Sequence, residues 1–186
     1  MLSPRISNRY GEDDYRYFGN DLSKGRSLHY TNALMVELNS HLVTDLGTFG
    51  FGWESRLEEI HSSNIGAHQR DNHGAYAELR SGWGTRLKGT LGLYANYNTD
   101  FGWQWYPGID AAWLFSDHWK VSASVGAGQR IPSFTDLYLN QLPGNLGNPS
   151  LKPENAWSYE IQMQYDHKNL DLQFGYFSRN ITDFID

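Results

Sequence analysis

Apolar and polar residues alternate along most of the chain. In one segment, for example, Trp157, Tyr159 and Ile161 are each followed by a polar residue. Successive side chains of a β-strand point to opposite faces, so this pattern predicts strands with one apolar face, and helical spacing explains it poorly. We therefore predict an all-β chain of about eight strands, at residues 30–42, 46–58, 73–82, 86–97, 103–115, 119–129, 155–166 and 170–180.

The connections between the predicted strands alternate in length. Short ones, such as 82–84 and 116–118, have the composition of tight hairpin turns. The intervening connections, at 61–72, 98–102 and 130–154, are longer. Short turns at one end of an antiparallel up-and-down meander and long loops at the other are typical of transmembrane β-barrels.

The apolar face of such a meander contacts either lipid or the core of a soluble domain. Strands of ten or more residues, Trp and Tyr at strand ends and a polar opposite face favour lipid. The alternative is a soluble carbohydrate-binding β-domain that stacks sugars on exposed Trp and Tyr. Aromatic residues make up 15% of the chain, which suits both interpretations.

Composition argues against several other classes of protein. The chain has no cysteine, so it has no disulfide framework, thiolate zinc site or thiol nucleophile. Its net charge is −6 at pH 7 and it has no run of Lys or Arg, which argues against nucleic-acid binding. No apolar stretch reaches the roughly 18–20 residues of a membrane-spanning helix. Residues 1–29 lack a leader-like apolar run, and we expect a polar loop or the end of a preceding hairpin there.

Sequence motifs in the last third of the chain are more specific than this periodicity. They read RIPSFTDLY at 130–138, GNPSLKPE at 147–154, WSYE at 157–160 and YFSRNITDFID at 176–186. In this order, the motifs resemble those of TonB-dependent receptors of the bacterial outer membrane. Upstream, 59–66, His68, Arg70 and 76–78 are similar to the vitamin B12 (cobalamin) receptor branch of that family.

The resemblance implies a fold and a function. Residues 30–186 would be a partial transmembrane β-barrel, cut from a ring of about 22 strands, with the plug domain and the closing strands expected to be absent. The whole receptor would contact outer-membrane lipid and bind a corrinoid or a ferric siderophore. It would import that ligand with energy that the TonB complex delivers through the plug. Neither catalysis nor a cofactor is implied.

Candidate site residues fall in two groups. Long loops on a rigid barrel commonly carry binding residues, so we expect ligand contacts from Asn64, His68, Arg70, Asn72 and His73 in one loop and from Tyr138, Asn140, Gln141 and Asn145 in the other. Turn-forming residues dominate the family motifs, which favours a structural role at the barrel rim over ligand contact. The motif residues with this expected role are Arg130, Pro132, Phe134, Leu137, Tyr138, Gly147, Asn148, Pro149, Leu151, Pro153 and Glu154.

Signatures of catalysis or metal binding are weak. His61, His68 and His73 share one predicted loop, but no carboxylate-backed ligand spacing accompanies them, which favours solvated loop histidines. Glu58 and Glu59 are neighbours on a strand and point to opposite faces, so they do not form a flanking acid pair. No nucleophile elbow is present either. We therefore expect no catalytic site and no metal site, and a lipid-acting barrel enzyme is disfavoured.

Overall fold

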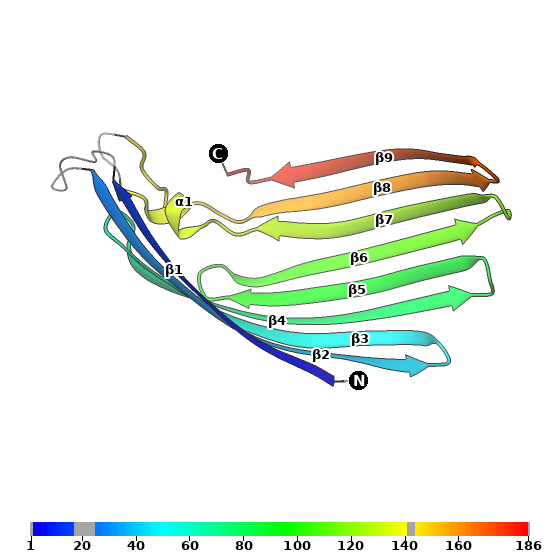
Figure 1. Ribbon diagram of the computed structural model, residues 1–186, viewed down its shortest axis with the longest axis horizontal. Coiled ribbons are helices and arrows are strands. Elements are labelled where there is room, and N and C mark those ends of the chain that lie inside the picture. Colours follow the sequence, from blue (N-terminus) through cyan, green and yellow to red (C-terminus); the bar gives the residue numbers. More distant parts are fainter. Residues whose placement is uncertain (1, 17–24, 141–143, 186) are drawn as a thin grey trace.

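The strands form one antiparallel sheet in which each strand pairs with its neighbours along the chain, in the order β1 to β9 (Figure 1). This computed structural model describes residues 2–16, 25–140 and 144–185. The strands are β1 (Leu2–Arg16), β2 (Arg26–Thr44), β3 (Gly47–Ser62), β4 (Gly66–Trp83), β5 (Leu87–Asn98), β6 (Gly102–Leu114), β7 (Trp119–Arg130), β8 (Glu154–His167) and β9 (Leu170–Thr182). A short helix, α1 (Phe134–Tyr138), lies between β7 and β8. No helix in these described ranges is long and apolar enough to cross a membrane.

The predicted all-β meander is confirmed, and each of the eight predicted strands corresponds to one of β2 to β9. Strand β1 was not predicted, because polar residues occupy both faces of its second half. Backbone pairing with β2 nevertheless runs from Leu2 opposite Ser40 to Arg16 opposite Arg26. Residues 2–16 therefore belong to the sheet.

The long loop expected at 61–72 is wrong. Strands β3 and β4 continue through this region until Ser62 lies opposite Gly66, and only a tight turn at 63–65 joins them. Alternation fails there because most residues on both faces are polar, whereas the backbone ladder needs no apolar residue to continue. We call the end of the sheet with the connections 45–46, 84–86, 115–118 and 168–169 the turn end, and the opposite end the loop end.

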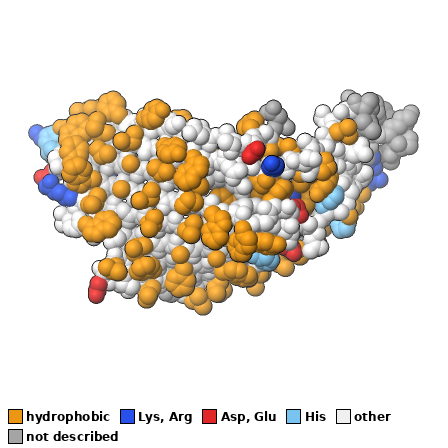
Figure 2. All heavy atoms as spheres, turned by 180° about the vertical axis from the view of Figure 1, so that it is seen from behind, with side chains coloured by type: hydrophobic (Ala, Val, Ile, Leu, Met, Phe, Trp, Pro, Cys, Tyr) orange, Lys and Arg blue, Asp and Glu red, His pale blue; other side chains and the backbone are white. Residues whose placement is uncertain are grey.

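Most large apolar side chains lie on one side of the sheet, here named the apolar face. Along one row of paired residues, Phe51 lies opposite Ala77, Ala77 opposite Leu93, and Leu93 opposite Pro107. Seen from behind Figure 1, hydrophobic side chains cover the sheet (Figure 2). Such a continuous exposed apolar surface exceeds what soluble monomers show and suits contact with lipid.

Aromatic side chains border the apolar face at both ends. At the turn end, the rings of Trp113, Phe115 and Trp119 lie in a row with centroids 5.8 and 6.1 Å apart. At the loop end, the rings of Tyr97 and Trp103 have centroids 5.5 Å apart. Trp103 and Trp113 are ten residues apart on β6, which is about 33 Å of strand and about 25 Å of membrane after a tilt of about 40°. The spacing matches the apolar band of an outer-membrane barrel.

The opposite side, here named the polar face, carries small and charged residues. Gly92, Gly108 and Gly126 lie in one row across β5, β6 and β7, with Glu78 of β4 at one end of the row and Ser158 of β8 at the other. The sheet curves toward this side at its loop end, where β1 to β4 rise (Figure 1). The polar face is therefore the side of the sheet on which a ligand or another part of the protein can lie.

A charge placed between the aromatic borders should be costly. Ile109 is 54% exposed on the apolar face, and we expect Ile109→Arg to lower the free energy of unfolding by about 2–4 kcal/mol, because the charge would enter the middle of the apolar band. Urea unfolding of the complete protein in lipid vesicles measures this loss. Ser124→Arg, on the polar face of β7, is the matched control and should cost less than half as much. Equal losses would contradict the assignment of the faces.

Candidate functional site

The connection 131–153 between β7 and β8 lies at the loop end and carries α1 (Figure 1). Ser133 caps the helix: its side chain accepts a hydrogen bond from the Asp136 backbone N–H, and the Asp136 side chain accepts one from the Ser133 N–H at 2.9 Å. Leu137 is only 2% exposed beneath the helix. Reciprocal capping and one buried anchor hold this five-residue helix in place.

The second half of the same connection packs against α1. The Gly147 N–H donates to the Leu139 carbonyl at 2.7 Å, and the Asn148 N–H donates to the Asp136 carbonyl at 2.8 Å. A Cβ atom at Gly147 would lie 2.6 Å from the backbone carbon of Leu137. The glycine of this motif is therefore needed for close approach of two backbone segments.

Arg130, the last residue of β7, joins the loop to the following strands. Its guanidinium donates to Glu154 Oε1 at 3.1 Å, to the Ile185 carbonyl at 3.3 Å and to Asp136 Oδ2 at 3.3 Å. Glu154 also accepts the Ile185 N–H at 2.7 Å. The two charged ends of the motif region thus bind each other across β7 and β8.

Arg70 on β4 is 5% exposed and joins three segments at the loop end. Its Nε donates to Asp100 Oδ2 at 2.7 Å and its Nη1 to the Pro132 carbonyl at 2.9 Å. The guanidinium also lies over the rings of Phe134 and Phe101, 4.5 and 5.5 Å from their centroids. Charge-assisted hydrogen bonds and cation–π contacts therefore tie β4 to the turn 99–101 and to the β7–β8 connection.

The turn 99–101 is fixed from below by two buried amides. Asn98 is fully buried, and its Oδ1 accepts the N–H groups of Asp100 at 2.9 Å and Phe101 at 3.2 Å. Its Nδ2 consequently faces Asn72, whose Oδ1 it contacts at 2.6 Å. Asn98 and Asp100 were not predicted from sequence, although an Asn that begins a short turn before Gly102 commonly bonds its own backbone.

Four of the residues expected to contact ligand meet at the loop end. The rings of His68 and Tyr138 stack with centroids 3.8 Å apart and planes inclined by 6°, and His68 Nε2 lies 2.8 Å from the Ile65 carbonyl. The Asn140 N–H donates to the Asn64 carbonyl at 2.8 Å. The β3–β4 turn and α1 therefore present Asn64, His68, Tyr138 and Asn140 as one surface, which we call the tip surface.

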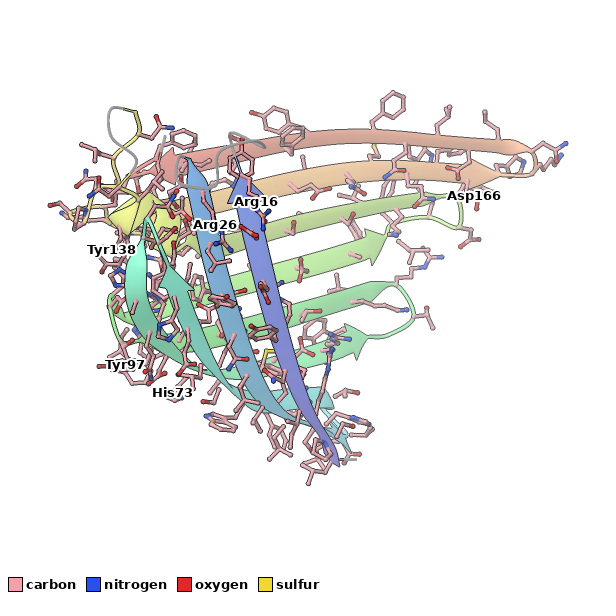
Figure 3. All side chains as sticks on the ribbon, turned by 60° about the vertical axis from the view of Figure 1, so that its left-hand side comes forward. Arg16, Arg26, His73, Tyr97, Tyr138 and Asp166 are labelled. Atoms are coloured by element: carbon pink, nitrogen blue, oxygen red, sulfur yellow. The ribbon has the colours of Figure 1, made fainter. Side chains whose placement is uncertain are left out.

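The other expected ligand contacts lie elsewhere. His73 is on the apolar face, opposite Tyr97, and contacts Ser55 Oγ at 2.9 Å (Figure 3). Asn145 is exposed in the β7–β8 connection, and Gln141 lies outside the described residues. Arg70 and Asn72 are buried among the internal partners above, and both also line a groove on the polar face.

Histidines at the loop end do not converge. His68 lies against Tyr138 on the polar face, whereas His61 and His73 occupy the apolar face at well-separated rows of β3 and β4. Across 2–16, 25–140 and 144–185, no three His, Asp or Glu side chains are placed to hold a metal ion together.

Beneath the loop, the polar face is hollowed into a groove of about 630 Å³. Its lining includes Glu54, Tyr94, Tyr106 and Gln129. The Tyr94 hydroxyl donates to Glu54, and the Tyr106 hydroxyl donates to Gln129 Oε1 at 2.9 Å. This polar lining was not singled out from sequence; its signal is the row of hydrogen-bonding side chains at alternate positions of β3, β5 and β6.

Comparison with known proteins decides the family. A family model described as "TonB dependent receptor-like, beta-barrel" matches residues 3–186. The chain belongs to this family. The vitamin B12 transporter BtuB of Photobacterium profundum is 30% identical over 193 residues, covering 99% of this chain and 30% of that protein. The iron-regulated outer membrane virulence protein of Vibrio cholerae is 24% identical over 166 residues, covering 82% of this chain and 25% of that protein. The chain thus spans less than a third of these relatives.

Solved structures of TonB-dependent receptors share the fold. The siderophore receptor PirA from Pseudomonas aeruginosa superposes with a TM-score of 0.79 at 20% identity, over 96% of this chain and 35% of that one. A mutant of the ferric enterobactin receptor PfeA from the same species gives 0.78 at 18% identity, over 97% and 31%. The family lies in the outer membrane of Gram-negative bacteria, so the short turns face the periplasm and the loop end faces outward. The predicted resemblance is confirmed, and the soluble alternative is not favoured.

Replacing Gly147 should loosen the loop of this TonB-dependent receptor barrel. The added Cβ of Gly147→Ala would meet backbone atoms that cannot yield cheaply, so we expect a loss of about 1–3 kcal/mol of local stability and at least about tenfold faster protease cleavage within 131–153 in intact cells. Gly128→Ala is the control, because nothing lies within 4 Å of its added Cβ. Equal cleavage of both variants would disprove the close-packing argument.

Arg70 should matter more than a surface arginine. Arg70→Met removes two hydrogen bonds and two cation–π contacts and leaves Asp100 without its cation, so we expect the turn 99–101 and the start of the β7–β8 connection to lose about 1–3 kcal/mol of protection. Hydrogen exchange measured by mass spectrometry reports this directly. Arg56→Met, which breaks an exposed 3.2 Å pair with Glu58, should change protection by no more than about 0.5 kcal/mol. Matching effects at both sites would refute the anchoring role of Arg70.

Proposed function

We propose that this barrel segment belongs to an outer-membrane receptor that binds a corrinoid or a ferric siderophore and imports it with TonB-derived energy. The observation that carries the proposal is the 30% identity to a vitamin B12 transporter along 99% of the chain. The fold shared with siderophore receptors supports the same general activity with a different ligand class. Import of this kind needs binding and release, and the proposal assigns no catalytic role to the chain.

The tip surface is the proposed ligand contact within this segment. Stacked His68 and Tyr138 are half-buried and offer a flat aromatic edge, and exposed Asn140 adds a hydrogen-bonding amide beside them. A large ligand with conjugated rings and peripheral amides or oxygens can use both contacts: its rings pack on the aromatic pair and its polar groups bond to the amide. Asn145 and Gln141 of the same connection remain proposed contacts, whereas Arg70 and Asn72 are proposed to position the surface.

The motif residues are proposed to frame this surface. Arg130 donates to both Glu154 and Asp136 at the base of the connection, and the Gly147 N–H donates to the Leu139 carbonyl just after α1. Because these contacts hold the base of the β7–β8 connection, ligand binding is assigned to the exposed residues of the tip surface. Coupling to TonB would pass through a plug domain on the polar face, where the groove described above offers hydrogen-bonding groups.

Direct binding and uptake measurements test the proposal. The complete protein, purified in detergent, would be titrated with cyanocobalamin and separately with ferric enterobactin, and uptake of the bound compound would be compared in cells with and without TonB. We expect one of the two to bind and its uptake to stop without TonB. Failure of both to bind, or uptake that is indifferent to TonB, would overturn the proposal.

Substitutions in the tip surface should distinguish residues that touch the ligand from residues that are only close to them in sequence. His68→Ala and Tyr138→Ala should each weaken binding of that ligand by about tenfold, or about 1.4 kcal/mol, because each removes half of the stacked pair. His73→Ala is the matched control: His73 lies close in sequence but on the apolar face, so binding should stay within about twofold. A larger effect at His73 than at His68 would remove the tip surface from the proposal.

A further inference from the structure

Two histidines meet at the turn end, opposite the proposed ligand surface. His118 ends the β6–β7 connection and His167 is the last residue of β8. Their Nδ1 atoms face each other at 3.4 Å, the ring centroids are 4.3 Å apart and the ring planes are inclined by 78°. Import of a nutrient through the loop end gives this pair no role.

We propose that His118 and His167 form a two-histidine site for Zn²⁺ on the periplasmic side of the barrel. In a tetrahedral site with Zn–N bonds of about 2.0–2.1 Å, two ligating nitrogens lie about 3.3–3.4 Å apart. Square-planar Cu²⁺ would need them at about 2.8–3.0 Å. The observed separation therefore matches the tetrahedral ion without movement of either strand.

The rings must turn to share an ion. If both Nδ1 lone pairs pointed at one ion about 2.05 Å away, the ring centroids would lie about 5.3 Å apart, whereas they lie 4.3 Å apart. Rotation of these side chains, without movement of the backbone, would open the pair. The Asp166 carbonyl oxygen is 3.1 Å from His118 Nδ1, close to a second edge of the same tetrahedron. Zn²⁺ would replace the proton that one imidazole nitrogen now shares, with this carbonyl and water available as the remaining ligands.

The sheet holds the two histidines in this relation. The Asp166 N–H donates to the His118 carbonyl at 2.8 Å, and Trp119 packs on Tyr165 with ring centroids 4.7 Å apart, where the β7–β8 ladder begins. A ligand pair whose backbone is already fixed loses little freedom on binding a metal.

The histidine pair is accessible to water, and the charges around it do not repel Zn²⁺. His118 is exposed and His167 half-buried, so an ion can reach both from water. The neighbouring Asp117 carboxylate pairs with Arg86 at 3.0 Å, and Lys168 follows His167 beside Asp166. Opposite charges therefore balance around the pair, and its affinity would come from the imidazoles.

Zinc titration of the complete protein in detergent tests the site. A chromophoric zinc indicator should report one more equivalent bound to the unmodified protein than to His118→Ala or His167→Ala, or affinity at least about tenfold weaker at that equivalent in each variant. Exposed His61 on β3 provides the control, and His61→Ala should bind as the unmodified protein does. X-ray absorption at the zinc edge should show two imidazole nitrogens that either variant loses.

A second readout needs no variant. Because the ion would bind the folded state, Zn²⁺ should raise the Tm of the unmodified protein by a few degrees, and a chelator should reverse the rise. No reversible rise in Tm would overturn the proposal even if a variant failed to fold. Zinc binding unchanged in both variants, or equally lost in His61→Ala, would overturn it too.

Discussion

Backbone hydrogen bonding in lipid is the constraint on which the rest of this structure depends. No water is present in the membrane interior to satisfy an N–H or C=O group, so each must find a partner in the protein. The antiparallel ladder between neighbouring strands from β1 to β9 supplies these partners, and between β6 and β7 it runs only from the pair Gly108–Gly126 to the pair Leu114–Lys120. Once the ladder is in place, only one face needs apolar side chains, and the polar face is free to carry glycines, charges and the groove.

The same constraint explains what could be predicted from sequence. Within the membrane, lipid enforces alternation, so Trp157, Tyr159 and Ile161 revealed their strand. Beyond the membrane, the ladder at 59–72 continues with polar residues on both faces, and its strands looked like a loop. β1 was missed for a related reason, because few apolar residues mark its single favourable face. Register, which places Arg16 opposite Arg26, leaves no mark in composition.

The candidate site was predictable in its residues and not in its contacts. Motif composition indicated a structured barrel rim, and the predicted loops included both Tyr138 and His68 as expected ligand contacts. Their stacking depends on where α1 lies over the β3–β4 turn, which no local pattern encodes. Arg70 looked like a ligand contact because it is polar and near the loops. Its partners Asp100 and Pro132 come from segments 30 and 62 residues away, so its burial follows only from the assembled sheet.

Differences in strand length make the loop end of the sheet taller on one side than on the other. β2, β3 and β4 have 19, 16 and 18 residues, whereas β5, β6 and β7 have 12 or 13. At about 3.3 Å per residue, the difference is about 10–20 Å of extra wall on one flank. The β3–β4 turn lies at the top of that taller flank, so the tip surface, to which it contributes Asn64, stands farther from the membrane than the β5–β6 turn does.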